Sequence, residues 1–154
     1  MAESEIVEIK QVWEAIKRQE RLDKGSGKTL DDIPMALPAL NRAIKLQKRA
    51  ASVGFDWPDV QPVVEKINEE LIELDIEIKG GDRDRMADEL GDLLFSCVNL
   101  ARHLKIDPEA SMRGANEKFK RRFESMELLA GEKKIEDYSA DQLESLWREV
   151  KQAE

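Results

Sequence analysis

The sequence predicts an all-α protein, and three of its properties lead to this expectation. Apolar residues recur every three or four positions along most of the chain, which is the period of a helix that buries one face. Charged residues make up 38% of the sequence and aromatic residues only 5%, a mixture typical of amphipathic helices. With 154 residues, the chain is long enough to bury one core without disulfides.

Charge and cysteine content exclude several classes of protein. A net charge of −8 argues against a surface that binds duplex nucleic acid, because phosphate contacts require a basic face. The single cysteine, Cys97, permits no internal disulfide and fits a reducing compartment. The sequence has no leader and no run of 18 apolar residues, so we expect a soluble, cytoplasmic protein with no membrane partner.

The first 30 residues are expected to form an N-terminal helix and a flexible loop, ahead of a main domain at residues 31–154. The helix is predicted from Ser4 to Leu22, with Trp13 and Ile16 on its apolar face. The loop after it contains G-S-G-K-T, which resembles the end of a phosphate-binding loop. That motif requires a glycine where Leu22 stands and a hydrophobic strand before it, so we interpret the segment as a linker.

A second helix is predicted from about Pro38 to Ala51, and the turn that follows it reads G-F-D-W-P-D. Asp56 or Asp59 is suited to cap the next helix, because a carboxylate can accept hydrogen bonds from the first amides of a helix. We expect the two aromatic side chains of this turn, Phe55 and Trp57, to anchor the core.

Two acidic helices, Val60–Lys79 and Asp82–Lys105, are predicted on either side of Gly80 and Gly81. Each has two acidic residues three positions apart on one flank of an apolar stripe. Four converging carboxylates repel one another unless a cation lies between them. Hard oxygen ligands suit Mg²⁺, with Mn²⁺ as a substitute. The residues concerned are Glu70 and Glu73 on the first helix and Glu89 and Asp92 on the second.

The same spacing has a simpler interpretation, in which a Glu-rich flank is a solvated helix face. The acid-x-x-acid pattern occurs on both helices, however, and this doubling favours a metal site. Two basic residues, Lys66 and Arg85, lie on the same flanks as the acids.

The apolar residues of the two acidic helices predict which faces are buried. The second helix is apolar outside its stripe as well, and such a helix is either central in its domain or covered by another subunit. A domain of this size has little room for the first arrangement, so we expect a homodimer built on Asp82–Lys105. The predicted stripes are Ile67, Leu71, Leu74 and Ile78 on the first helix, and Met86, Leu90, Leu93, Leu94, Cys97, Ala101 and Leu104 on the second.

A further helix is expected to start at Asp107 and Pro108 and to end near Ala130, because a capping carboxylate followed by proline is typical of a helix start. On it, Lys118 and Arg122 share one ridge, which spacing alone would interpret as solvated. Its predicted buried stripe is Met112, Ala115, Phe119, Phe123 and Met126.

The last helix is predicted to begin at a capping box formed by Ser139 and Gln142, and Trp147 lies on its apolar face. The expected architecture is therefore four principal helices between about Val60 and Val150, with one or two N-terminal helices packed against them.

The acidic motifs, taken with longer matches, resemble the MazG family of nucleoside triphosphate pyrophosphohydrolases. The family's E-E-x-x-E and E-x-x-D correspond to Glu69-Glu70-x-x-Glu73 and Glu89-x-x-Asp92. Other stretches similar to this family include A-L-P-A-L, V-G-F-D-W, E-L-G-D-L-L-F and V-N-L-A-R-H-L. The resemblance runs from about Trp13 to Lys151, and it is to the second half of the two-domain members.

The resemblance implies hydrolysis of nucleoside triphosphates between the α and β phosphates, with release of a monophosphate and pyrophosphate. It implies Mg²⁺ ligation by the four acids named above, and we expect Glu69 or Glu73 to accept the proton of the attacking water. The nucleotide contacts that it implies run from Lys66 to Glu70 and from Arg85 to Asp88, and include Lys118, Arg122 and Trp147.

Two alternative functions are considered. One is a helical interaction or regulatory module that has kept the fold without turnover, although such a module has no need of four crowded carboxylates. The other is a narrow house-cleaning enzyme for dUTP or dCTP, since other all-α pyrophosphohydrolases share the acidic motif. We find no constellation in the sequence that would recognise one base.

Overall fold

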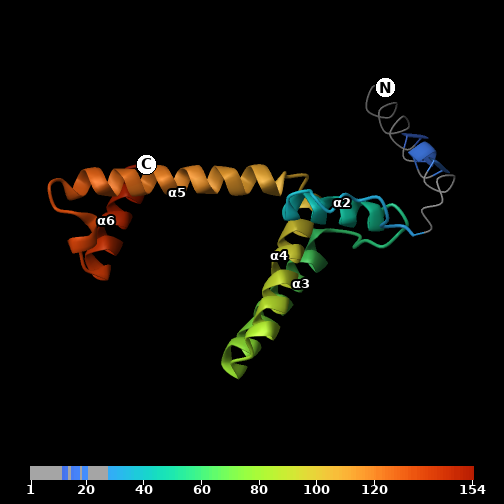
Figure 1. Cartoon of the computed structure of the whole chain (residues 1–154), viewed down its shortest axis with the longest axis horizontal. Helices are drawn as coiled ribbons and strands as arrows, with labels where there is room; N and C mark the ends of the chain where they lie inside the picture. Colours follow the sequence, from blue (N-terminus) through green and yellow to red (C-terminus); the bar gives the residue numbers. More distant parts are fainter. Residues whose placement is uncertain (1–11, 14, 18, 21–27) are drawn as a thin grey trace. The chain divides into compact units, whose positions relative to one another are not determined.

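The computed structural model describes residues 12–13, 15–17, 19–20 and 28–154. Helix is the regular secondary structure throughout this part of the chain, and the predicted all-α class is confirmed. The described residues between 12 and 20 are helical, while most of the predicted helix Ser4–Leu22 lies outside them. With the labels of Figure 1, the elements are α2 (Ala39–Ala51), α3 (Val60–Gly80), α4 (Arg83–His103), α5 (Pro108–Ala130), the 3₁₀ helix η1 (Ile135–Asp137) and α6 (Ala140–Gln152).

The chain divides into two compact units, residues 1–104 and residues 105–154. The first unit contains α2, α3 and α4, and the second contains α5, η1 and α6. The predicted boundary between residues 30 and 31 stays a prediction.

The helix ends follow the capping signals of the sequence. Asp59 begins α3 by accepting a hydrogen bond from the Gln61 amide, and Asp82 begins α4 by accepting bonds from two amides of its first turn. Gly81 ends α3 with a φ of 78°, a left-handed conformation that glycine adopts without steric cost. These caps hold α3 and α4 in an antiparallel hairpin with a tight turn.

In the first unit, α3 and α4 lie side by side and α2 packs on α4 (Figure 1). The Gln47 side chain joins α2 to α4, since its Nε2 donates to the Phe95 carbonyl at 2.9 Å. Val63 and Val98 are the most deeply buried apolar residues of the hairpin, with exposed fractions of 0% and 3%. The core of this unit therefore lies where the three helices meet.

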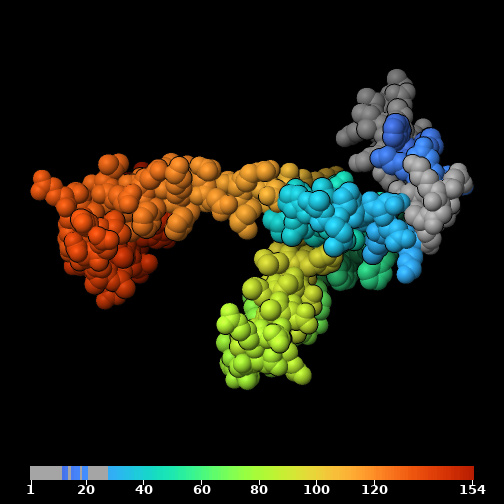
Figure 2. All heavy atoms as spheres, viewed as in Figure 1, coloured from blue at the N-terminus to red at the C-terminus, as the bar shows by residue number. Residues whose placement is uncertain are grey.

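The predicted apolar stripes of the two acidic helices are largely exposed in the single chain. Leu71 and Ile78 on α3 and Leu90 and Leu94 on α4 are each close to half exposed. The physical reason is that acidic residues such as Glu70 and Glu77 are largely buried on α3, so these apolar side chains lie on a face that is exposed in the single chain. On the face drawn in Figure 2, the half of the hairpin near its turn is covered by no other segment of residues 28–104.

The aromatic residues of the G-F-D-W-P-D turn are not core anchors, contrary to expectation. Phe55 is 82% exposed and Trp57 is 42% exposed. Asp56 holds the turn instead, because Arg102 donates to both of its carboxylate oxygens and His103 Nε2 lies 3.1 Å from Oδ1. An ion pair between the turn and the end of α4 thus replaces the expected aromatic packing.

In the second unit, the C-terminal half of α5 packs on α6. Asp107 caps α5, and Ser139 with Gln142 forms the predicted capping box of α6. Of the predicted α5 stripe, Met126 is buried, but the remaining members are exposed because α6 covers only part of this long helix within the unit: Met112, Ala115, Phe119 and Phe123.

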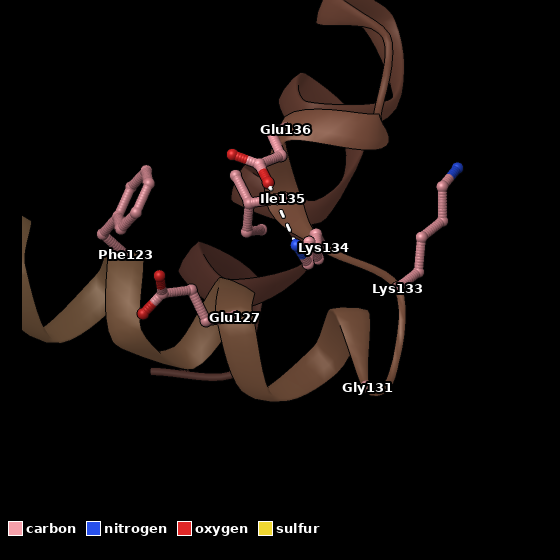
Figure 3. A pocket seen from close by; sticks show the side chains of 7 residues that line it. All are labelled: Phe123, Glu127, Gly131, Lys133, Lys134, Ile135 and Glu136. Atoms are coloured by element: carbon pink, nitrogen blue, oxygen red, sulfur yellow. Dashed lines mark ion pairs between the residues drawn. The ribbon is translucent and has the colours of Figure 1, made fainter.

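The connection between α5 and α6 borders an open hollow of about 510 Å³ (Figure 3). Lys134 Nζ lies 3.6 Å from Glu136 Oε1 at its edge. The hollow is lined by Phe123, Glu127, Gly131, Lys133, Lys134, Ile135 and Glu136.

None of the helices in the described part of the chain has the length and apolar character needed for a membrane span.

Candidate active site

Three carboxylates of the α3–α4 hairpin converge on one point. Glu70 and Glu73 lie one turn apart on α3, and the tight turn at Gly81 brings Glu89 of α4 against them. One oxygen from each side chain lies within 4.8 Å of the others. At this separation the carboxylates repel one another strongly unless a cation or a proton intervenes.

Glu70 is the most buried member of this cluster, with only 3% of the residue exposed. Lys66 Nζ, one turn earlier on α3, lies 2.7 Å from Glu70 Oε1 and 3.2 Å from Glu69 Oε1. The hydrogen bond to Glu70 is the main cause that raises the pKa of Lys66. The second oxygen, Glu70 Oε2, is buried and has no hydrogen-bond partner among the described residues. A buried carboxylate oxygen without a partner is costly, so Glu70 is arranged for a ligand that the side chains alone do not provide.

The carboxyl of Glu89 shows the effect of the crowding. Partial burial is the main cause that raises its pKa, and repulsion from Glu73, Glu70, Asp92 and Glu77 acts in the same direction. A divalent cation between these groups would favour their ionised forms and remove the repulsion.

The donor set fits Mg²⁺ or Mn²⁺. Hard divalent ions take carboxylate oxygens as ligands, and the three acids come from two helices held rigidly by a capped turn. Asp92, one turn after Glu89, is exposed and lies outside the group of three, although its charge contributes to the raised pKa of Glu89. Metal ligation by the four predicted acids stays a prediction.

The basic residues predicted on the acidic flanks differ in their surroundings. Lys66 is held by the two glutamates described above. Arg85 is 70% exposed at its side chain, with its guanidinium 3.6 Å from Glu77 and 3.7 Å from Asp82. Asp88 is exposed on the surface of α4. Lys66 is thus held close to the carboxylates, while the more exposed Arg85 makes longer ion pairs with Glu77 and Asp82.

Sequence reasoning left Glu77 out of the candidate set. Its side chain is 19% exposed, it is the closest carboxylate to Arg85 and it helps to raise the pKa of Glu89. The signal for it was present, because Glu77 lies on the same flank of α3 as Glu70 and Glu73.

The remaining predicted nucleotide contacts belong to the second unit. Arg122 donates to Glu154 Oε2 from Nε at 2.9 Å and from Nη2 at 2.6 Å. Its guanidinium also lies 5.9 Å from the ring centre of Trp147, whose ring packs against Phe119. Lys118, one turn before Arg122, is exposed. This unit therefore contains an arginine next to an aromatic ring, with a carboxylate bound to the arginine.

Comparison with known protein families gives a match that includes this hairpin. Residues 59–126 match the MazG family, described as the MazG nucleotide pyrophosphohydrolase domain. This segment includes α3, α4 and most of α5, together with Glu69, Glu70, Glu73, Glu77, Glu89 and Asp92.

Named relatives match over most of the chain. It is 46% identical over 146 residues to a nucleoside triphosphate pyrophosphohydrolase of Escherichia coli K12, covering 92% of this chain and 56% of the relative. It is 42% identical over 141 residues to the nucleoside triphosphate pyrophosphohydrolase/pyrophosphatase MazG of Thermotoga maritima, covering 90% of this chain and 54% of the relative. It is also 43% identical to YabN of Bacillus subtilis, covering 92% of this chain and 29% of that protein. The chain thus spans about half the length of the first two relatives, and its residues 59–126 are similar to the MazG nucleotide pyrophosphohydrolase domain.

Proposed function

We propose that the protein is a Mg²⁺-dependent nucleoside triphosphate pyrophosphohydrolase, which cleaves between the α and β phosphates to give a monophosphate and pyrophosphate. The observation that carries this proposal is the convergence of Glu70, Glu73 and Glu89 within a MazG domain. The buried and unpartnered Glu70 Oε2 supports it, since a silent module would gain nothing from retaining such a costly group.

Each group of residues has a separate role in this proposal. The acids Glu70, Glu73, Glu89 and Asp92 hold the cation. When bound, Mg²⁺ would polarise the phosphoryl oxygens and offset the charge of the substrate. Glu69 or Glu73 would accept the proton of the attacking water.

The basic residues would bind the substrate phosphates. Lys66 is held at the carboxylate cluster, and Arg85 has an exposed side chain that can reach a phosphate. Charge develops on the pyrophosphate as it leaves, and fixed cations stabilise that charge. Lys118, Arg122 and Trp147 of the second unit stay predicted nucleotide contacts.

We also propose that the protein is a homodimer built on α4. Leu90, Leu94 and Phe95 on α4 and Leu71 and Ile78 on α3 are between about 45% and 56% exposed in the single chain. Exposed apolar side chains on both helices of the hairpin favour a subunit interface there. A cytoplasmic location, which the single cysteine suggests, stays a prediction.

Product analysis tests the proposed reaction. Purified protein is incubated with ATP or a dNTP and Mg²⁺, and pyrophosphate and orthophosphate are measured separately. Pyrophosphate and a nucleoside monophosphate are expected, and Glu89→Ala should abolish their release. Orthophosphate as the direct product would overturn the assignment.

A matched control separates catalysis from general charge effects. Glu65→Gln removes the same charge from an exposed position of α3, outside the carboxylate cluster, and should retain activity. Equal activity in wild type and Glu89→Ala would favour the non-catalytic module. Rates across the eight common NTPs and dNTPs would separate a broad enzyme from one restricted to dUTP or dCTP.

A further inference from the structure

The α3–α4 hairpin places one more carboxylate, that of Glu77, between the acidic cluster and the turn. Glu77 lies four residues before Gly81 and Arg85 lies four residues after it, so the two side chains face each other across the hairpin. Glu73 and Glu89 are each eight residues from the same glycine, and they meet in the carboxylate cluster. Four residues are about one helical turn. The ion pair between Glu77 and Arg85 therefore lies about one turn from the cluster.

The carboxylate of Glu77 is directed toward Arg85. Its Oε1 lies 3.6 Å from Arg85 Nη1. Its Oε2 lies beside the turn, since a methyl group on Gly80 would be 3.9 Å from it. The described carboxylates that lie within 4.8 Å of one another do not include Glu77. The placement of Glu77 therefore suits contact with Arg85 better than ligation of a cation held by the cluster.

Glu77 is the more constrained partner of this ion pair. Its side chain is 19% exposed, compared with 70% for Arg85. Its backbone carbonyl accepts a hydrogen bond from the Gly81 amide at 2.9 Å, at the point where α3 ends. A largely buried side chain has few accessible rotamers, whereas an exposed arginine has many. The position of Glu77 therefore restricts the position of the Arg85 guanidinium.

The ion pairs of Arg85 leave its N–H donors available. Its guanidinium lies 3.6 Å from Glu77 and 3.7 Å from Asp82, and both distances exceed hydrogen-bond length. Arg122 differs, because it donates to Glu154 at 2.9 and 2.6 Å. A guanidinium has five donors, and a phosphate can accept from two of them at once. Glu77 thus attracts Arg85 without occupying the donors that a phosphate would need.

Arg85 has a second carboxylate within reach on its own helix. Glu89 follows Arg85 by four residues on α4, and side chains four residues apart on a helix are neighbours. An arginine paired with Glu89 would bring a positive charge to the carboxylate cluster. That charge would repel a divalent cation at the cluster. The ion pair with Glu77 is an alternative to this arrangement.

We propose that Glu77 is a positioning residue, which holds Arg85 near the hairpin turn and keeps it from pairing with Glu89. Glu89 then stays available to the cation, and the donors of Arg85 stay available to a phosphate of the substrate. This inference rests on the proposed function, and it adds a residue that acts through Arg85 and contacts neither the cation nor the nucleotide.

A double-mutant cycle on metal binding tests this role without turnover. Binding of Mn²⁺ to the full-length protein is measured from the electron paramagnetic resonance signal of the free ion. Glu77→Gln keeps the shape of the side chain and should raise the Kd about three- to fivefold, within the range that an exposed ion pair supplies. In an Arg85→Gln background, which has no guanidinium to pair with Glu89, the same substitution should raise the Kd by less than about twofold, because the remaining charge effect is screened.

A matched control separates this role from the loss of a charge. Asp75→Asn removes a carboxylate of α3 that also pairs with a cation, Lys79, but Asp75 lies two residues from Glu77 and so on nearly the opposite face of the helix. It should leave the Kd unchanged in both backgrounds. Glu77→Asp keeps the charge and shortens the side chain, so it should show the same dependence on Arg85 even if Glu77→Gln does not fold.

Two results of the metal titration would overturn the positioning role. One is an equal change of Kd in the two backgrounds, since the loss of charge would then explain it without Arg85. The other is a wild type that binds no Mn²⁺, because Glu89 would then have no cation to bind.

The same cycle in steady-state kinetics addresses the substrate. At saturating Mg²⁺, Glu77→Gln should lower kcat/KM for NTPs about three- to fivefold with Arg85 present and by less than about twofold in Arg85→Gln. A lower KM in Glu77→Gln would mean that Glu77 competes with phosphate for Arg85, contrary to the positioning role. The two proposals can fail separately. A wild type that releases no pyrophosphate would end the proposed function, while the dependence of Mn²⁺ binding on Arg85 decides the role of Glu77.

Discussion

The crowding of the carboxylates can be tested by removing one of them in the absence of metal. Glu73 is the most informative choice. Glu70 forms an ion pair with Lys66 at 2.7 Å, so replacing it would lose an attraction together with a repulsion. Glu73 is half-buried within 4.8 Å of both other acids, and it has no ion pair among the described residues. Glu73→Gln therefore removes repulsion and keeps the shape of the side chain.

The size of the effect follows from the distance between Glu73 and Glu70. Two unit charges at 4.8 Å repel by about 0.9 kcal/mol in water and about 3.5 kcal/mol at an effective dielectric constant of 20. Glu73 is partly solvated and Lys66 offsets part of the charge of Glu70, so we expect a gain of about 1–2 kcal/mol in the free energy of unfolding. For a chain of this length, that gain raises Tm by about 2–8 °C. Repulsion from Glu89 adds to the gain.

With Mg²⁺ or Mn²⁺ bound, wild type should become more stable than Glu73→Gln, which is the reverse of their order without metal. A cation that binds only the folded state stabilises wild type by about 2.7 kcal/mol at a hundredfold excess over its Kd, which corresponds to about 5–11 °C in Tm. Glu73→Gln lacks one of the converging carboxylates and should respond much less to Mg²⁺ or Mn²⁺. NaCl at matched ionic strength should have little effect on either protein.

Thermal unfolding followed by far-ultraviolet circular dichroism, first in EDTA and then with Mg²⁺ or Mn²⁺, provides the assay. Glu65→Gln is the control, because it makes the same charge change on an exposed position of α3. The reasoning would be refuted if Glu73→Gln had the same Tm in EDTA as Glu65→Gln and its Tm still rose with Mg²⁺ as much as that of wild type. The pKa of Glu89, measured by NMR, should also move toward its ordinary value in Glu73→Gln, because Glu73 is one of the groups that raise it.

Three further predictions concern other contacts. Asp56→Asn should lower the free energy of unfolding by about 1–2 kcal/mol, because it breaks a largely buried pair with Arg102. Folding lowers the pKa of Asp56, so the difference in unfolding free energy between wild type and Asp56→Asn should be present at pH 7 and vanish as the pH falls through that pKa. Urea unfolding at several pH values measures this difference. Under the proposed function, Glu154→Gln should lower KM for NTPs by up to about fivefold in steady-state assays, because it removes a carboxylate that competes with phosphate for Arg122, whereas an unchanged or higher KM would contradict this role. Leu94→Lys should shift the mass measured by light scattering from a dimer toward the 17.6 kDa of the monomer, and a wild type that is already monomeric at micromolar concentration would contradict the proposed interface.

Local signals in the sequence were sufficient for the helices and for much of the candidate site. Asp59, Asp82 and Asp107 begin α3, α4 and α5, and Gly81 ends α3, because capping depends on residues within one turn of each helix end. The convergence of Glu70, Glu73 and Glu89 follows from helical spacing and a short turn, which are also local properties.

Burial could not be predicted in the same way. Leu71, Ile78, Leu90 and Leu94 have the spacing of a core stripe but are exposed in the single chain, while the charged Glu70 is buried. Helical periodicity defines which residues share a face, but it does not determine which face meets another helix. That choice depends on how α2, α3 and α4 pack against one another.

The sequence by itself therefore determined the all-α class, the capped hairpin and the residues that share its acidic flank, since each depends on neighbours within a few positions. Only the tertiary structure decided that Glu70 Oε2 and Gln47 Oε1 are buried without partners, and that Phe55 and Trp57 line a cavity rather than the core. Gln47 and Phe95 are 48 positions apart, and they meet because α2 packs on α4. Contacts between such distant residues arise from packing, which no local pattern in the sequence encodes.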